Sequence, residues 1–189
     1  MVEFLTSSWL PILAAAVGVF VASFITHMVL PYHKSDMQKV PAGKEDEILD
    51  ALRRANLPPG DYAAPHAGGA AGMKDPAFIA KATKGPLALM TIAPGAPPSM
   101  GPQLALWFLY TVVVSGVSAY VVWRVFGADH TFGAVFRFAC VLTFLSYAMA
   151  LPAQSIWYRK SWATTLKSMF DGAIYGLVTG AAFAYLWPK

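Results

Sequence analysis

The sequence is poor in the residues that stabilise small soluble proteins. Only one of its 189 residues is a cysteine and only 13% are charged, against roughly one-quarter charged in soluble domains. The single cysteine, Cys140, excludes an intrachain disulfide, a redox pair and a metal cage built from cysteines. In contrast, 57% of the residues are hydrophobic, and this composition predicts an integral membrane protein.

The familiar catalytic motifs are also missing from the sequence. It contains no Walker loop, no HExxH, no GxSxG and no Rossmann glycine fingerprint after a strand. The run GGAAG, residues 68–72, lacks the lysine and hydroxyl residue that would follow it in a phosphate-binding loop. We therefore predict that the chain is not an enzyme and expect no cofactor.

Long apolar runs predict an all-α bundle of four transmembrane helices, because about 20 apolar residues cross about 30 Å of hydrocarbon. A closed barrel would show short alternating strands instead. The first run is expected to be a helix rather than a cleaved signal peptide, because its flank carries Glu3 and its apolar core is too long. The predicted spans within a single membrane domain, 1–189, are 9–30, 104–126, 134–157 and 168–187, and 31–102 forms an extramembrane loop.

The distribution of cations predicts an orientation. Eleven of the fourteen lysines and arginines lie in or beside the loops that follow the first and third predicted helices. Since cationic loops are retained in the cytoplasm, the long loop is expected inside and both termini outside. These loops also explain the net charge of +4 without any nucleic acid as a partner.

The long loop is predicted to contain one short amphipathic helix. The stretch KEDEILDALRRANLPPG, residues 44–60, has acids in its first turn, arginines in its last and an Asp50–Arg54 pair four residues apart. Residues 60–76 are rich in Gly, Ala and Pro, which indicates a loosely ordered segment. The apolar residues 85–102 are expected at the membrane interface or against the bundle, with a re-entrant loop as an alternative.

The end of the first predicted helix carries possible ligands. His27, His33 and Asp36 lie in THMVLPYHKSD, residues 26–36, and all three types bind divalent metals. Pro31 separates the histidines, so they lack the one-turn spacing that places two ligands on one helix face. An interfacial anchor is the preferred interpretation, and a metal or proton site is the alternative.

A second polar group lies between the second and third predicted helices. Arg124 and Arg137 flank Asp129 and His130 in a tight turn. We expect a structural clasp in which the arginines pair with Asp129. The alternative is an anion or lipid-headgroup site formed by the two guanidinium groups.

Asp171 is the acid of the fourth predicted helix. A start near Ser168 places it about one turn, about 5 Å, below the cytoplasmic interface, where the helix dipole and Lys167 can stabilise it. The functional alternative is a cation or proton site formed by Asp171 and His27.

Small residues recur every four positions along the first and fourth predicted helices. Such faces let membrane helices approach closely, either within one chain or between two copies. The predicted packing residues are Ala14, Gly18 and Ala22, and Gly172, Gly176 and Gly180.

Both ends of the chain resemble small bacterial four-helix membrane proteins classed as domains of unknown function. The resemblance lies in WLPILAAAVGVFVASFITHMVLPYHKSD and IWYRKSWATTLKSMFDGAIYGLVTGAAFAYLWP, about a third of the chain, whereas the long loop departs from a compact connection. It implies a four-helix architecture in a bacterial inner membrane and brings no activity.

Three functions are compatible with the sequence. The preferred one is a non-enzymatic scaffold or accessory subunit in the lipid bilayer, forming a homo-oligomer or part of a larger membrane complex. The least favoured is a metal-dependent membrane enzyme. Between these two stands a small channel or transporter for cations or protons, whose path would be lined by Ser23, His27, Ser115, Ser118, Ser146, Gln154 and Asp171.

Overall fold

The computed structural model describes residues 2–127 and 130–188. The chain, expected from its sequence to be one domain, divides into two compact units. The first comprises the segment up to Gln38 together with the segment from Ser99 onward, and the second is Lys39–Pro98. Each unit is described by itself.

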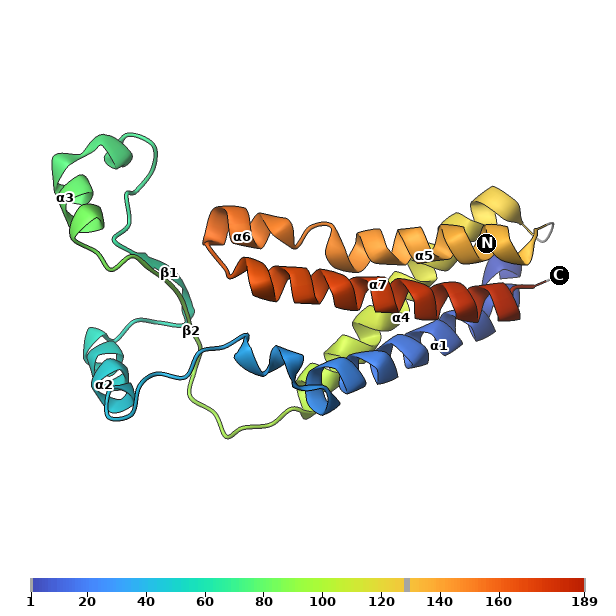
Figure 1. Ribbon diagram of the computed structural model, residues 1–189, viewed down its shortest axis with the longest axis horizontal. Helices are drawn as coiled ribbons and strands as arrows, with labels where there is room; N and C mark the ends of the chain where they lie inside the picture. Colours follow the sequence, from blue (N-terminus) through green and yellow to red (C-terminus); the bar gives the residue numbers. More distant parts are fainter. Residues whose placement is uncertain (1, 128–129, 189) are drawn as a thin grey trace. The chain divides into compact units, whose positions relative to one another are not determined.

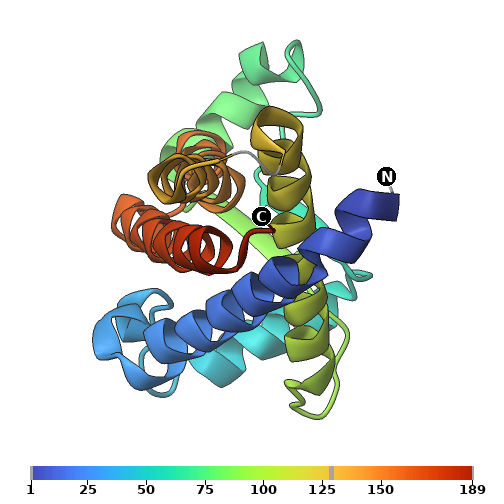
Figure 2. The same ribbon diagram turned by 90° about the vertical axis from the view of Figure 1, so that its right-hand side faces the viewer.

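The first unit is a helical bundle. Four long apolar stretches have the length and hydropathy to cross a membrane, which confirms that part of the fold prediction: Thr6–Val29, Gly101–Phe126, Phe132–Tyr158 and Trp162–Leu186. They belong to α1 (Val2–Phe24), α4 (Gly101–Phe126), α5 (Phe132–Ala148) with α6 (Pro152–Tyr158), and α7 (Trp162–Leu186). The start of α1 and the end of α7 lie at the same end of the bundle (Figures 1 and 2).

The third predicted span is interrupted, contrary to the continuous helix expected over 134–157. Residues 149–151 form turns between α5 and α6, where Leu151 N donates to Ala148 O over 3.1 Å. Pro152 explains the break because proline lacks the N–H that a continuing helix needs, and it occupies the first turn of α6.

The fourth helix begins earlier than predicted. It starts at Trp162 rather than near residue 168, since 162–167 contains no helix-breaking residue. Asp171 therefore lies more than two turns inside α7, not about one turn from its start as expected, and it is 1% exposed.

The first helix ends in a different backbone geometry. After Phe24 the chain widens into a π-helical turn, η1 (Ile25–Val29), and Leu30 N donates to Ile25 O over 2.9 Å. Leu30 is extended because Pro31 disfavours a helical residue before it. A 3₁₀ helix, η2 (Pro31–Ser35), follows and turns its side chains back toward the bundle.

The glycines of α7 pack against α5 and not against the small residues of α1. An added Cβ at Gly176 would lie 2.7 Å from Cys140 O, and one at Gly172 would lie 2.8 Å from Ala148 Cβ. The helices α5 and α7 accordingly run side by side (Figure 1). On α1, a Cβ at Gly18 would lie 2.7 Å from Val178 Cγ1, and Ala14 and Ala22 are half-buried.

A buried apolar cluster fills the bundle near the end at which α1 starts and α7 ends. It draws on α1, α4, α5 and the residues that end α7. Its members include Phe4, Ala15, Val122, Ala139, Phe183 and Trp187. The outward faces of the same helices carry many exposed large apolar side chains, which is the pattern of helices that face lipid.

The second unit contains more regular structure than its sequence indicated. The amphipathic helix is confirmed as α2 (Glu45–Ala55), but Asp50 pairs with Arg53 over 2.5 Å, not with Arg54. The segment expected to be loosely ordered contains β1 (Gly60–Ala64), η3 (Gly72–Lys74) and the start of α3 (Pro76–Lys84). β1 pairs antiparallel with β2 (Ala88–Ile92), which adds a two-stranded sheet to the predicted all-α fold.

Candidate carboxylate and imidazole site

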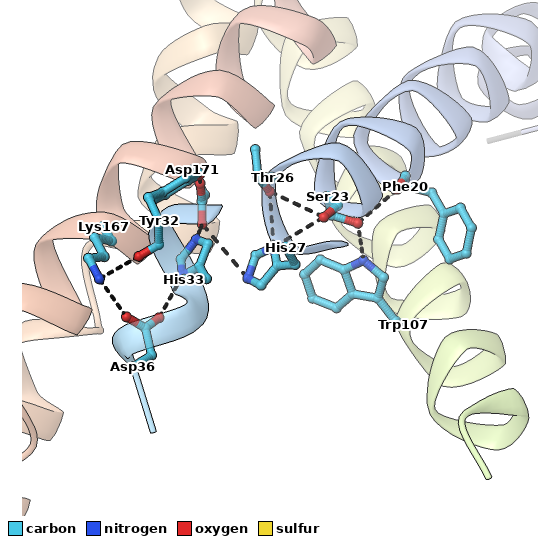
Figure 3. Close-up of polar contacts among 10 residues, drawn as sticks. All are labelled: Phe20, Ser23, Thr26, His27, Tyr32, His33, Asp36, Trp107, Lys167 and Asp171. Carbon is cyan, nitrogen blue, oxygen red and sulfur yellow. Dashed lines mark hydrogen bonds and ion pairs between the residues drawn. The ribbon is translucent and has the colours of Figure 1, made fainter. Parts of the chain in front are cut away.

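The structure brings together two groups of residues that are far apart in the sequence. Thr26 and His27 lie on η1, Tyr32 and His33 lie on η2, and Asp171 comes from the middle of α7 (Figure 3). The turn at Pro31 is what allows this meeting, because it follows the end of η1 and folds η2 back against α7. All of these residues belong to the first unit.

Asp171 is the buried centre of the site. Its Oδ1 accepts a hydrogen bond from the Tyr32 hydroxyl, and its Oδ2 lies 2.8 Å from His33 Nε2. His27 Nε2 lies 3.8 Å from the same Oδ2. A buried carboxylate needs such partners, since an unpaired charge in a low-dielectric interior is strongly destabilising.

His33 connects Asp171 to a second carboxylate. Its Nδ1 lies 2.5 Å from Asp36 Oδ2, and the other carboxylate oxygen of Asp36 accepts from Lys167 Nζ over 2.9 Å. Lys167 also donates to Tyr32 O over 2.6 Å. The predicted pair of Lys167 with Asp171 is therefore replaced by a pair with Asp36, because η2 lies between the two α7 side chains.

His27 completes the group from the π-helical turn. Its Nδ1 lies 3.1 Å from Ser23 O and 2.9 Å from Thr26 Oγ1. Because the Ser23 carbonyl can only accept, Nδ1 carries the proton in the neutral ring and Nε2 keeps its lone pair. The His27 and His33 rings are stacked at 4.2 Å, and the His27 side chain is 48% exposed while that of His33 is 8% exposed.

The surroundings of η2 shift the pKa values of Tyr32 and Asp36. Burial, the hydrogen bond to Asp171 and the charge of Asp171 raise the pKa of Tyr32 to about 12, so its hydroxyl remains a donor. Burial also tends to raise the pKa of Asp36, but the hydrogen bonds from His33 and Lys167 outweigh it and leave this pKa below its usual value. Asp36 is therefore a carboxylate at neutral pH.

Side chains on α4 border the site. Trp107 Nε1 donates to Ser23 Oγ over 2.8 Å, which links α4 to the end of α1. An apolar pocket of about 330 Å³ lies beside this contact, and His27 is among its lining residues together with Phe20, Phe24, Leu104 and Trp107. His27 thus contacts both the pocket and the polar cluster.

The site contains some residues that the sequence singled out and excludes others. His27, His33, Asp36 and Asp171 all belong to it, whereas Ser146 is exposed and donates to Leu142 O on its own helix. Ser23, Ser115 and Ser118 are buried, and Gln154 is half-buried in α6.

Among the described residues, no ion pair involves either arginine of the predicted anion site. Arg124 lies in the last turn of α4, Arg137 lies on α5, and both side chains are exposed. Asp129, the predicted partner in the clasp, lies outside the described residues.

The sequence did not single out Tyr32 and Trp107 as partners in the site, and it named Ser23 only as part of a possible transport path. Tyr32 and His33 are separated from Asp171 by 139 and 138 positions, so no local pattern connects them. The only usable signal was the presence of hydrogen-bonding side chains directly after Pro31. Comparisons with protein-family models, curated proteins and solved structures gave no match to this chain.

Proposed function

We propose that this chain is a multi-pass protein of the bacterial inner membrane that binds a cation at Asp171 and passes it through the bundle. The observation that carries the proposal is the buried carboxylate of Asp171, placed inside an apolar helix with His33 and His27 at its open side. Ionisable residues inside membrane spans are expensive, and they commonly mark ion pathways.

Buried hydroxyl groups support a path beyond Asp171. On α7, Tyr175 and Thr179 follow Asp171 at intervals of four residues, so all three share one helix face. Among the described side chains, six buried hydroxyls have no hydrogen-bond partner: Ser8, Ser118, Thr143, Tyr147, Tyr175 and Thr179. A hydroxyl left without a partner costs about 1–3 kcal/mol, so these groups favour a polar solute between the helices.

The orientation belongs to the same proposal. The bias of lysines and arginines supports an orientation with Lys39–Pro98 in the cytoplasm and both termini in the periplasm. The Asp171 site then lies at the cytoplasmic end of the bundle. The scaffold function is less well supported, since α5 occupies the glycine face of α7 that would have formed a seam between copies.

A flux assay tests the proposal. The protein would be reconstituted in liposomes, and cation uptake and pH-gradient decay would be compared for the wild type, Asp171→Asn and the matched control Asp61→Asn. Asp61 is an exposed carboxylate of β1 that only accepts from Thr91 Oγ1. We expect flux in the wild type and the control that is lost in Asp171→Asn, and wild-type flux equal to empty liposomes would contradict the proposal.

A second candidate function is a metal-dependent membrane enzyme that acts on an apolar substrate. The pocket beside His27 favours it, because its lining is mainly aliphatic and aromatic and it lies next to the imidazoles. Chemical change of added membrane lipids by the wild type, lost in His27→Ala, would distinguish catalysis from transport.

A further inference from the structure

We infer that the site binds a divalent transition-metal ion through His27 Nε2, His33 Nε2 and Asp171 Oδ2. The inference rests on the proposed function and names the class of its cation. The ligand atoms that these three residues offer all lie within 4.8 Å of one another. Two imidazoles with one carboxylate form a ligand set that suits zinc and related metals, whereas calcium and magnesium prefer oxygen ligands alone.

His33 is held as a metal-ligating histidine usually is. Such a histidine donates its other ring N–H to a carboxylate or carbonyl, which fixes the tautomer and the orientation of the ring. Here His33 Nδ1 lies 2.5 Å from Asp36 Oδ2, and Lys167 fixes Asp36 from its other oxygen at 2.9 Å. Nε2 of His33 therefore faces Asp171 and can exchange its hydrogen bond for a metal bond.

His27 is held in the same way by a different acceptor. The Ser23 carbonyl oxygen lies 3.1 Å from Nδ1, which leaves Nε2 on the side of Asp171. The rings of His27 and His33 are stacked and nearly parallel. One ring must therefore turn before the Nε2 lone pairs of both can point at one ion. The exposure of His27, at 48%, gives its ring room to turn.

The spacing of the ligand atoms fits a small ion. Metal bonds of about 2.0–2.2 Å in a tetrahedron place neighbouring ligand atoms about 3.3 Å apart. The distance from Asp171 Oδ2 to His33 Nε2 is 2.8 Å and that to His27 Nε2 is 3.8 Å, one slightly shorter and one slightly longer than this value. Tyr32 holds the other oxygen, Oδ1, and thereby orients Oδ2 toward the imidazoles.

Three ligands leave a fourth position open. Structural zinc sites usually have four protein ligands, whereas sites that exchange or activate a ligand keep one position for water or substrate. An open position also allows the ion to leave, which transport requires. The site is therefore suited to an exchangeable ion rather than to a permanent structural one.

The test is a binding titration of the purified full-length protein in nanodiscs. Zn²⁺ would be titrated calorimetrically, and Co²⁺ would be titrated while its visible absorption is recorded, because tetrahedral Co²⁺ absorbs more strongly than hydrated Co²⁺. We expect one ion per chain. We also expect His33→Ala and Asp171→Asn to lose more than the roughly 10–100-fold in affinity that removal of an outer partner causes.

Further variants separate the metal site from a merely structural cluster. Asp36→Asn should weaken binding about 10–100-fold, and Lys167→Met should weaken it less because Asp36 still holds His33. The matched control is His66→Ala, since His66 is an exposed histidine of the second unit that accepts from Gly68 N. This control should bind like the wild type.

His27→Ala keeps the test sharp if other variants fold poorly. His27 is the most exposed of the three ligands, so its removal leaves the contacts of Asp171 with His33 and Tyr32 in place. We expect weaker Zn²⁺ binding and loss of the Co²⁺ absorption in a protein that remains folded. Binding by the wild type that is unchanged in both His27→Ala and Asp171→Asn would overturn the inference, as would the absence of binding.

The result is separable from the flux result. Metal binding without flux would support the metal site and contradict transport. Flux that needs Asp171, in a protein that binds neither Zn²⁺ nor Co²⁺, would support transport and contradict the metal site.

Discussion

Replacing Gly176 by alanine tests the packing that positions α7, and with it Asp171. The new Cβ would lie 2.7 Å from Cys140 O, whereas ordinary contact begins at 3.4 Å, so α5 and α7 must separate by about 0.7 Å. The obstacle is a backbone oxygen inside α5, which cannot rotate away as a side chain could. Over-packing of this kind costs about 1–3 kcal/mol.

Alanine also favours the helix by about 1 kcal/mol relative to glycine, so the net loss for Gly176→Ala should be about 0–2 kcal/mol. Gly116 provides the matched control because it lies within α4 and an added Cβ there meets no atom within 4 Å. Gly116→Ala should therefore keep or raise the free energy of unfolding.

The assay is a denaturant titration of both variants in mixed micelles, followed by far-ultraviolet circular dichroism. We expect Gly116→Ala to exceed Gly176→Ala by about 1–3 kcal/mol in the free energy of unfolding, which is the over-packing cost alone. If Gly176→Ala is as stable as Gly116→Ala, the close approach of α5 and α7 is refuted.

Four further predictions address other contacts. Gly180→Ala should destabilise the bundle, and adding Cys140→Ala should restore only part of the loss, since the new Cβ lies 2.9 Å from Phe136 O as well as near Cys140 Sγ; full restoration in a thermal melt would contradict this. Asp171→Asn should lower the free energy of unfolding by about 1–3 kcal/mol, because the charged acceptor of the Tyr32 and His33 hydrogen bonds is lost; unchanged stability would argue against these partners. Trp107→Phe should cost about 0.5–1.5 kcal/mol by removing the 2.8 Å hydrogen bond to Ser23, and it should have no such effect in a Ser23→Ala background. Reporter fusions at residue 70 should indicate cytoplasm and fusions after Lys189 the periplasm, and the opposite pattern would reverse the orientation.

Local patterns in the sequence predicted the long helices and failed where the fold depends on distant contacts. The apolar runs and the acid-to-base gradient of α2 are local, so four long helices and one amphipathic helix could be found from them. Pro152 lies within the third predicted span, and the N–H that it lacks explains the break between α5 and α6. Hydropathy does not reveal this break, because the residues on both sides of it are apolar. The two-stranded sheet pairs residue 60 of β1 with residue 92 of β2, and no local pattern in the sequence connects them.

The candidate site was predictable by residue type but not by arrangement. His27, His33, Asp36 and Asp171 each stood out as ionisable residues in or beside apolar helices. Their convergence depends on the turn at Pro31 and on how η2 packs against α7, which are tertiary features. The early start of α7 also places Asp171 further from the helix start than expected, because a span counted back from Trp187 omits the helical residues 162–167.

X-ray absorption at the zinc edge of the Zn²⁺-loaded protein tests the cation site most directly. The account predicts two imidazole nitrogens at about 2.0–2.1 Å and a carboxylate oxygen at about 2.0–2.2 Å, with the oxygen contribution altered in Asp171→Asn. A sulfur ligand at about 2.3 Å, which only Cys140 or a methionine could supply, would contradict it. A spectrum of hydrated zinc, or one unchanged by Asp171→Asn, would contradict it equally.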